Sequence, residues 1–477
     1  MADEQHAAAG AQAAPPQPNP AAVLPRDLAK LAGLGALIGV PTGLVAFGFI
    51  TLVHWLEDWL WTDLPDALGA DAPPWYLVLG LPVLGAVLVY FARMLPGNGG
   101  HSPIEGASTS EVAKPAHLPG IILAALATLP FGLVLGPEAP LIALGSGLAV
   151  WLTGWAKLPP KAGLVVGMSG SGAAMSTLFG GPLVSGLMLL EGGVGAGALV
   201  IPLIIPALAS SAVAYFLITG LGDWSGLPMA GMSLPGLPAY DEVLVRDIGV
   251  AVLVGLLAAL VAHVVRTLAT KVAAAEPRIG RLPLLLLGGA GVGALALVAD
   301  LMGGDSQVVL FSGQTGVAPL VAESSAGVVL VLLVAKALGY VLSLGAGFRG
   351  GPIFPAIFLG VALAAFGVIA FDMSPTVAIA MGAAAGMTAM TRMVVSPVLF
   401  AALLTGRAGL SAISVAVIAT VVAWLGSAVI DHRLLLRHRR NDADDAAVHT
   451  AAAGTALPAV RPGTTDGRTT AHSGESA

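Results

Sequence analysis

The sequence predicts an all-α, polytopic membrane protein built from two related halves. Of its 477 residues, 56% are hydrophobic and only 10% are charged, whereas a soluble domain carries roughly 25% charged residues. Many of its apolar segments are short and punctuated by glycine or proline, a pattern typical of discontinuous and re-entrant membrane helices. A motif of the first half also recurs in the second half.

The repeat is defined by one constant offset. The stretch 136–145, Gly-Pro-Glu-Ala-Pro-Leu-Ile-Ala-Leu-Gly, matches 351–360 at an offset of 215, with both prolines and both glycines kept. The same offset aligns 167–176 with 382–391 and Pro182 with Pro397. Paired apolar segments interrupted by Gly and Pro in two halves indicate the binding site of a transporter.

The first half follows a polar tail. Residues 1–27 are rich in Ala, Pro and Gln, lack the pattern of a secretory signal, and are predicted to be disordered. Apolar segments are predicted at 28–52, 75–94, 121–135, 141–156, 161–179, 183–191 and 196–220. Several are shorter than the roughly 20 residues that cross a bilayer, so we expect half-helices among them.

A polar stretch at 221–245 separates the halves, which gives one transmembrane domain over 28–430 with halves at about 28–220 and 246–430. The second half is predicted to contain segments at 247–272, 282–302, 326–346, 352–371, 376–391, 394–406 and 411–430. The tail 431–477 begins with four arginines between 433 and 440 and is otherwise predicted to be disordered.

The basic residues predict the orientation of the chain in the cell membrane. Arg26 and Lys30 begin the first span, and the arginine cluster follows the last span. Because lysine and arginine concentrate on the cytoplasmic side of membrane proteins, we expect a multi-pass protein with both termini in the cytoplasm.

Glu138 stands out as a carboxylate in an apolar setting. It lies between Pro137 and Pro140, and the nearest other acids are Glu111 and Glu191. A charge at membrane depth costs about 2.5–3.5 kcal/mol and usually has a function. Proline favours a helix start, and a helix N-terminus attracts anions. We therefore predict a half-helix start inside the membrane with an acid where an anion would bind; the alternative is a surface loop acid that caps a helix.

Other classes of function find little support in the sequence. There are no cysteines, and the nine histidines show no ligand spacing, so we predict no metal site and no cofactor. No Ser/His, Asp/Asp or HExxH arrangement occurs in the apolar segments, so we do not expect an enzyme. Nor do we expect a nucleic-acid partner.

Several motifs together carry a family resemblance. Gly136-Pro137-Glu138-Ala139-Pro140 resembles the G-x-E-G-P signature of the CLC chloride channels and transporters, and 347–355, Gly-Phe-Arg-Gly-Gly-Pro-Ile-Phe-Pro, resembles their G-G-x-F-x-P signature. The stretches 98–107 and 181–191 are similar to the family's first pore loop and to an apolar segment that ends in acids. The resemblance covers about 28–430 and is nearest to a bacterial subgroup of ion-transport proteins.

The resemblance implies a homodimer in the lipid bilayer, with two inverted halves and one pore per subunit. The partner would be chloride or a similar small anion held by helix N-termini, and Glu138 would be the gating glutamate that competes with it. The implied anion-binding residues are Gly136, Pro137, Ala139, Ser102, Gly351, Ile353 and Phe354. Because Pro352 has no N–H, the donors of the second half would be the amides of Ile353 and Phe354.

The departures from the family pattern bear on coupling to protons. Ser102 is a candidate for the pore-loop serine, and no tyrosine follows Tyr340, although the family places an anion-binding tyrosine in its last helix. Glu191 lies one residue before the position of the family's inner proton acceptor, where this chain has Gly192. The sequence therefore favours channel-like anion transport. A proton/anion antiporter for chloride or fluoride and a transporter of another small solute are the alternatives.

For each of three charged residues the sequence allows two interpretations. Glu191 is either a charge at a helix end or a proton relay. Arg349 and Arg392 either attract anions or satisfy carbonyl groups at helix ends.

Overall fold

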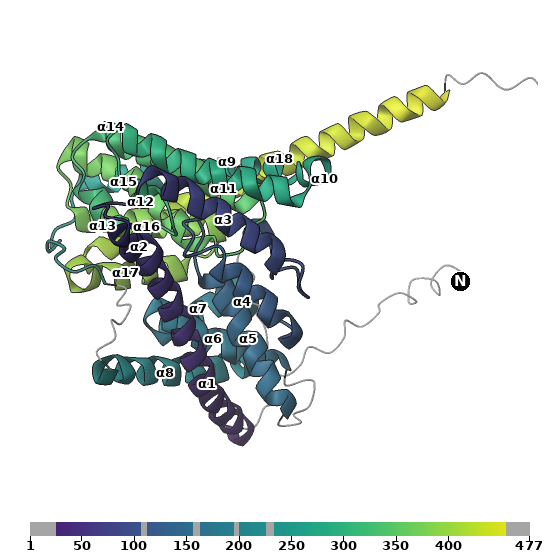
Figure 1. Ribbon diagram of the computed structural model, residues 1–477, viewed down its shortest axis with the longest axis vertical. Coiled ribbons are helices and arrows are strands. Elements are labelled where there is room, and N and C mark those ends of the chain that lie inside the picture. The colour runs from purple at the N-terminus through teal and green to yellow at the C-terminus, as the bar shows by residue number, and fades with distance from the viewer. Residues whose placement is uncertain (1–24, 106–111, 156–162, 195–199, 226–232, 455–477) are drawn as a thin grey trace, which may run out of the picture. The chain divides into compact units, whose positions relative to one another are not determined.

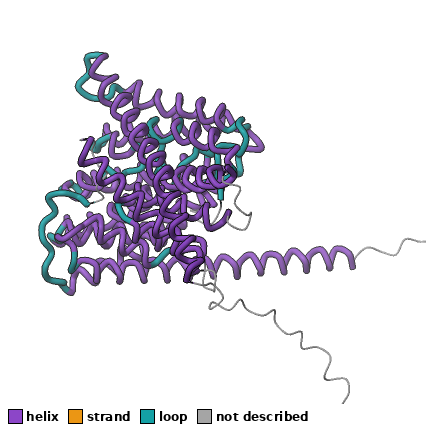
Figure 2. Tube along the Cα trace, turned by 90° about the horizontal axis from the view of Figure 1, so that it is seen from below, coloured by secondary structure: helices purple, strands orange, loops and turns teal. Residues whose placement is uncertain are grey.

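The computed structural model describes residues 25–105, 112–155, 163–194, 200–225 and 233–454. Over these ranges the chain forms helices and no strand, which confirms the predicted fold class (Figure 2). The chain divides into two compact units, 1–427 and 428–477, and everything below on packing concerns the first. Most of the predicted tail 1–27 lies outside the described residues.

The first half contains eight α-helices within the described ranges (Figure 1). They are α1 (Pro25–Asp58), α2 (Leu64–Ala67), α3 (Trp75–Ala92), α4 (Leu118–Leu126), α5 (Glu138–Trp155), α6 (Gly163–Phe179), α7 (Pro182–Leu189) and α8 (Val200–Ser225). A π-helical turn, Trp59–Asp63, joins α1 to α2, and a short 3₁₀ turn, Pro103–Glu105, lies between α3 and α4.

The second half contains ten α-helices within the described ranges. They are α9 (Val245–Ala273), α10 (Glu276–Ile279), α11 (Arg281–Leu301), α12 (Ser306–Val309), α13 (Val317–Ala322), α14 (Ala326–Gly345), α15 (Ile353–Phe371), α16 (Pro375–Thr391), α17 (Val395–Thr405) and α18 (Ala412–Gly454). Across the described residues, eight helices are long and apolar enough to cross a membrane, while α4 to α7, α16 and α17 are shorter. These short helices agree with the half-helices expected from the sequence.

Two boundaries differ most from the sequence prediction. The segment expected at 121–135 is helical only to Leu126, because Pro130 removes a backbone donor and Gly132 takes a φ of +83° that ends regular helix. At the other end, α18 continues to Gly454 through residues expected to be disordered. That stretch is rich in alanine, which has the highest helix propensity.

Glycines let corresponding helices approach closely in both halves. A Cβ added to Gly145 of α5 would lie 2.3 Å from the carbonyl oxygen of Gly170 in α6, and one added to Gly360 of α15 would lie 2.1 Å from that of Gly382 in α16. Close backbone contact at small residues is how membrane helices pack. The repeat seen in the sequence is therefore also a repeat of packing between corresponding helix pairs.

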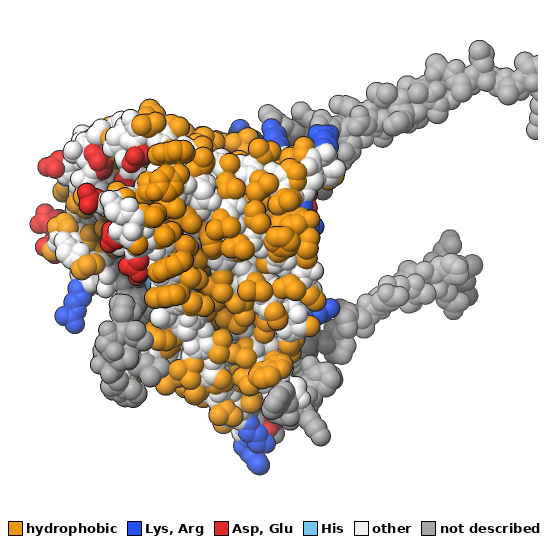
Figure 3. Space-filling model, viewed as in Figure 1, with side chains coloured by type: hydrophobic (Ala, Val, Ile, Leu, Met, Phe, Trp, Pro, Cys, Tyr) orange, Lys and Arg blue, Asp and Glu red, His pale blue; other side chains and the backbone are white. Residues whose placement is uncertain are grey.

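The surface of the molecule matches a membrane protein. Figure 3 shows a face covered broadly by hydrophobic side chains, with acidic side chains gathered at the edge near α13 and α14. Most of the basic side chains visible on this face lie at the opposite edge. An apolar band between two polar edges is what a bilayer requires.

We expect Gly360→Ala to lower the thermal stability of the detergent-solubilised protein. The new methyl group would overlap the Gly382 carbonyl oxygen, and such overpacking costs about 1–3 kcal/mol. Melting followed by size-exclusion chromatography would measure it. Gly48→Ala is the matched control, since nothing lies within 4 Å of its added Cβ; equal melting temperatures for both variants would contradict the packing account.

Candidate functional site

The two repeated motifs meet directly. The amide of Gly136 donates a hydrogen bond to the carbonyl oxygen of Gly351 at 2.8 Å, and the amide of Gly351 donates one to the carbonyl oxygen of Gly136 at 2.5 Å. Both glycines lie just before a helix start, since α5 begins at Glu138 and α15 at Ile353. The reciprocal hydrogen bonds thus hold the starts of one helix from each half side by side.

Glu138 lies at this junction, fully buried. Its Oε1 accepts hydrogen bonds from the amide of Ile353 and, at 3.2 Å, from the amide of Phe354. The expectation of a helix starting at Glu138 is confirmed, and the alternative of a surface acid is wrong. The carboxylate does cap a helix, but a buried one from the other half of the chain.

The room for the carboxylate comes from two glycines. A Cβ added to Gly136 would lie 2.0 Å from Glu138 Oε2, and one added to Gly351 would lie 2.2 Å from its Cδ. Oε2 itself has no hydrogen-bond partner among the described residues. The carboxylate is therefore held through one oxygen only, in a space that side chains at these positions would fill.

The remaining predicted residues of the two motifs surround the same point. Pro137 lies just before α5 and Ala139 lies in its first turn, and both residues are half-buried. The ring of Phe354 stacks on Phe179 of α6 with centroids 5.7 Å apart and meets the edge of Phe400 of α17 at 6.1 Å. Aromatic side chains from three helices thus cover the start of α15.

Tyr340 lies close to the amides that bind Glu138, although the sequence had assigned it no role. It is fully buried on α14, and its hydroxyl donates to the carbonyl oxygen of Pro352 at 2.7 Å. Pro352 directly precedes the amides that bind Glu138. The last tyrosine of the chain therefore supports the turn that begins α15.

Ser102 belongs to a loop that Arg349 holds. Arg349 donates to the carbonyl oxygen of Asn98 through Nε at 3.2 Å and Nη2 at 3.0 Å, and to that of His101 at 3.4 Å. Its side chain is buried. This geometry matches the structural interpretation of Arg349, although the carbonyls belong to a loop rather than to a helix end. Ser102, half-buried, lies next to His101 in that loop.

Glu191 makes contacts of a different kind. Its carboxylate accepts from the amides of Val394 (3.0 Å), Val395 (2.7 Å) and Ser396 (2.8 Å), and from the Ser396 hydroxyl (2.6 Å). These are the contacts expected of a charge at the start of α17. Arg392 lies at the end of α16, where its backbone has a left-handed φ of 66° and its amide bonds to the Thr388 carbonyl oxygen.

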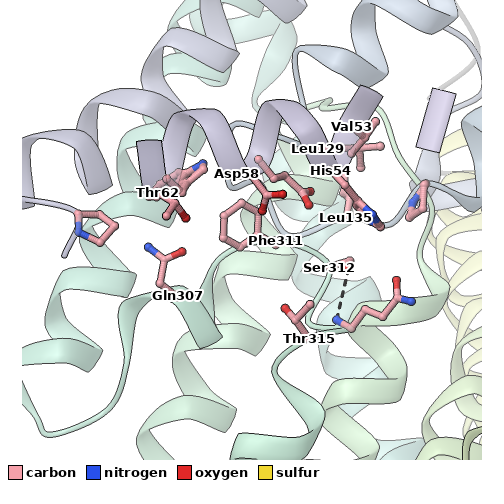
Figure 4. A pocket seen from close by; sticks show the side chains of 15 residues that line it. Val53, His54, Asp58, Thr62, Leu129, Leu135, Gln307, Phe311, Ser312 and Thr315 are labelled. Atoms are coloured by element: carbon pink, nitrogen blue, oxygen red, sulfur yellow. Dashed lines mark hydrogen bonds between the residues drawn. The ribbon is translucent and has the colours of Figure 1, made fainter. Parts of the chain in front are cut away.

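A cavity of about 420 Å³ opens beside the Glu138 motif (Figure 4). His54, Glu57 and Asp58 of α1 line one wall, and Leu135 and Pro137 also border the cavity. The facing wall is lined by Gln307, Phe311, Ser312, Gln314 and Thr315. Pro137 is the residue before Glu138, so the cavity reaches the edge of the motif. Among the described residues, His54, Glu57 and Asp58 are the titratable groups in its lining.

Lys336 on α14 was not singled out by the sequence analysis, and it is fully buried. It is the one charged residue in the apolar stretch 326–346. Because a charge inside a span is costly and usually functional, that isolation was a signal the sequence did contain.

Comparisons with known proteins find relatives of this chain. A family model described as "Voltage gated chloride channel" matches residues 105–427. The chain is 29% identical over 333 residues to "Putative ion-transport protein YfeO" of Escherichia coli, covering 68% of this chain and 76% of that protein. It is 28% identical over 335 residues to the protein of the same name from Salmonella newport, covering 69% and 77%.

Solved structures share the fold. A slow cyanobacterial Cl⁻/H⁺ antiporter superposes with a TM-score of 0.67 at 17% identity, covering 87% of this chain and 100% of that one. A CLC-type fluoride/proton antiporter superposes with a TM-score of 0.62 at 20% identity, covering 84% and 96%.

We expect Glu191→Ala to destabilise the protein by about 1–2 kcal/mol, because the start of α17 loses its acceptor for three amides. A lower melting temperature would show it. Glu242→Ala removes an exposed acid outside the helices and serves as control; if both variants melt alike, Glu191 does not stabilise α17.

Proposed function

This chain belongs to the voltage-gated chloride channel family, and we propose that it carries chloride or a similar small anion across a membrane through a pore that Glu138 closes. The proposal rests on the hydrogen bonds that the Glu138 carboxylate accepts from the amides of Ile353 and Phe354 at the start of α15. Those amides are the donors from which a transported anion would accept hydrogen bonds.

The gate follows from competition for one binding place. A carboxylate and a mobile anion both favour the positive end of a helix, and the space between Gly136 and Gly351 is filled by the Glu138 carboxylate. When Glu138 binds a proton, it loses the charge that holds it at the helix start. It then turns aside, and an anion takes its place.

The cavity beside Pro137 supplies a route to the gate from one side of the membrane. It lies at the end of α1 that is far from Arg26 and Lys30, and this helix of 34 residues is roughly 50 Å long. With the N-terminus in the cytoplasm, the cavity faces the outside. External protons and anions therefore reach Glu138 through it.

Channel-like transport is the form of the function that we favour. A second proton acceptor on the inner side would serve tight antiport, and Gly192 offers no side chain there; antiport without it would need a chain of water molecules to carry protons. Glu191 is engaged by four hydrogen bonds at the start of α17, so its charge serves the helix. Coupled chloride/proton or fluoride/proton exchange is the second candidate, because the structural neighbours reported above are described as antiporters.

We place the protein in the cell membrane as a homodimer, with 28–430 as the transmembrane domain and both termini in the cytoplasm. The apolar surface seen in Figure 3 supports insertion in a bilayer, and the basic residues at the first and last spans support the orientation.

We expect Glu138→Gln to remove the dependence of anion flux on external pH. In the wild type, lowering the pH protonates Glu138 and raises the flux; glutamine stays uncharged at every pH, so its flux stays high and flat. Chloride efflux from liposomes at several external pH values would measure this. Glu191→Gln is the control and keeps the wild-type profile, whereas identical profiles for wild type and Glu138→Gln would make Glu138 a structural cap.

We also expect the reversal potential of the reconstituted protein to follow the anion gradient alone when a pH gradient is imposed. The reason is the lack of a free inner acid near Gly192. A shift with pH at a fixed anion-to-proton ratio would establish antiport instead. Loss of that shift in Glu191→Gln would then identify Glu191 as the relay.

A further inference from the structure

The buried lysine on α14 has an unusual set of partners. Lys336 Nζ donates to the carbonyl oxygens of Val308 at 3.1 Å, Leu310 at 2.6 Å and Phe311 at 3.0 Å. It also lies 4.9 Å from the ring centroid of Phe358 on α15. No carboxylate in the described part of the chain pairs with it.

The geometry holds the charged form of this side chain. An ammonium group has three N–H donors, and three carbonyl oxygens accept them, whereas a neutral amine has only two. The aromatic face of Phe358 also attracts a cation. These contacts favour the ammonium form of Lys336, and they oppose the desolvation penalty of several kcal/mol that a buried charge carries.

Two contacts place this charge near the start of α15. Tyr340, one helical turn after Lys336 on α14, donates to the carbonyl oxygen of Pro352. Phe358, beneath the ammonium group, follows Ile353 by about one and a half turns of α15. Helix geometry then puts Lys336 Nζ on the order of 10 Å from the amides that hold Glu138.

We propose that Lys336 is a specificity-determining residue of the anion site: its fixed charge makes the start of α15 favourable for an anion whenever the Glu138 carboxylate is absent. This inference rests on the proposed function. At that separation, and with water excluded, the attraction between unit charges is not screened as it is at a surface. While Glu138 is in place its carboxylate balances the lysine; once it is protonated or displaced, a mobile anion does so.

Within the described part of the chain, Arg93 and Arg349 are also buried cations, and their contacts differ from those of Lys336. Arg349 is bound to the loop carbonyls of Asn98 and His101, and Arg93 donates to Asn98 and to the Gly347 carbonyl oxygen. They therefore surround the loop that carries Ser102. Lys336 instead approaches α15 from α14, where it is 0% exposed.

A purely structural role would also fit the three carbonyl contacts. In that case Lys336 would only hold the segment 308–311, whose Phe311 packs on Trp61 at 5.2 Å. The two roles differ in what its removal changes. Loss of a clamp lowers stability, while loss of a charge lowers the affinity for anions and the preference for anions over cations.

The test uses full-length protein in liposomes, with chloride as the probe. Lys336→Met and Lys336→Gln both remove the charge, but the glutamine side chain keeps two N–H donors. Lys336→Arg keeps the charge. Ser343→Ala is the matched control: Ser343 is buried on the same helix, and its hydroxyl accepts from the amide of Val134, so the change loosens a backbone contact without altering charge. The readouts are the half-saturating chloride concentration, the chloride-to-cation permeability ratio from reversal potentials in a salt gradient, and the melting temperature.

For Lys336→Met and Lys336→Gln we expect a half-saturating chloride concentration about tenfold higher than that of the wild type and a lower chloride-to-cation permeability ratio. Lys336→Arg should give values near those of the wild type. Ser343→Ala should shift neither value by more than twofold. If Met does not fold, Gln alone decides. A folded Met or Gln variant with unchanged affinity and permeability ratio would overturn the proposal, as would an Arg variant that loses as much as Gln. Absence of chloride flux in the wild type would instead overturn the proposed function.

Discussion

The hydrogen bonds between one buried carboxylate and one helix start constrain the rest of the structure. A charge in a bilayer needs compensation, and Glu138 obtains it from backbone amides at the N-terminus of α15. Those amides are free because a helix leaves its first donors unpaired. The arrangement requires α15 to begin inside the protein and requires glycine at 136 and 351. The paired motifs meet these requirements through their reciprocal backbone hydrogen bonds.

The same kind of contact occurs twice across the halves, with different outcomes. Glu138 reaches α15 and Glu191 reaches α17, so in both cases an acid from the first half caps a helix of the second. Glu191 uses both oxygens, for four hydrogen bonds. Glu138 uses one, and its other oxygen has no partner among the described residues. The two helix starts are therefore capped to different extents, one through both carboxylate oxygens and the other through a single oxygen.

Local sequence rules predicted the helix start at Glu138 and the short helices, and the family resemblance implied the amides of Ile353 and Phe354 as donors. Proline and glycine positions fix these features within a few residues of the chain. The partners of Lys336, Tyr340 and Arg349 lay beyond such rules, because each contact joins segments that the fold alone brings together. The isolation of Lys336 in an apolar span marked it as unusual, but its three carbonyl acceptors lie in α12 and the residues just after it, 25 to 28 residues away.

A gate needs a bound state that is not too stable, and the contacts of Glu138 meet that condition. An ionised carboxylate offers about four acceptor sites, and Oε1 alone is used by Ile353 and Phe354. Oε2 has no partner among the described residues, so part of the desolvation cost of the charge is left uncompensated. Because Gly136 and Gly351 have no side chains, the space stays open once the carboxylate leaves. Under the proposed function, this incomplete pairing is what would allow an anion to take the place of the Glu138 carboxylate.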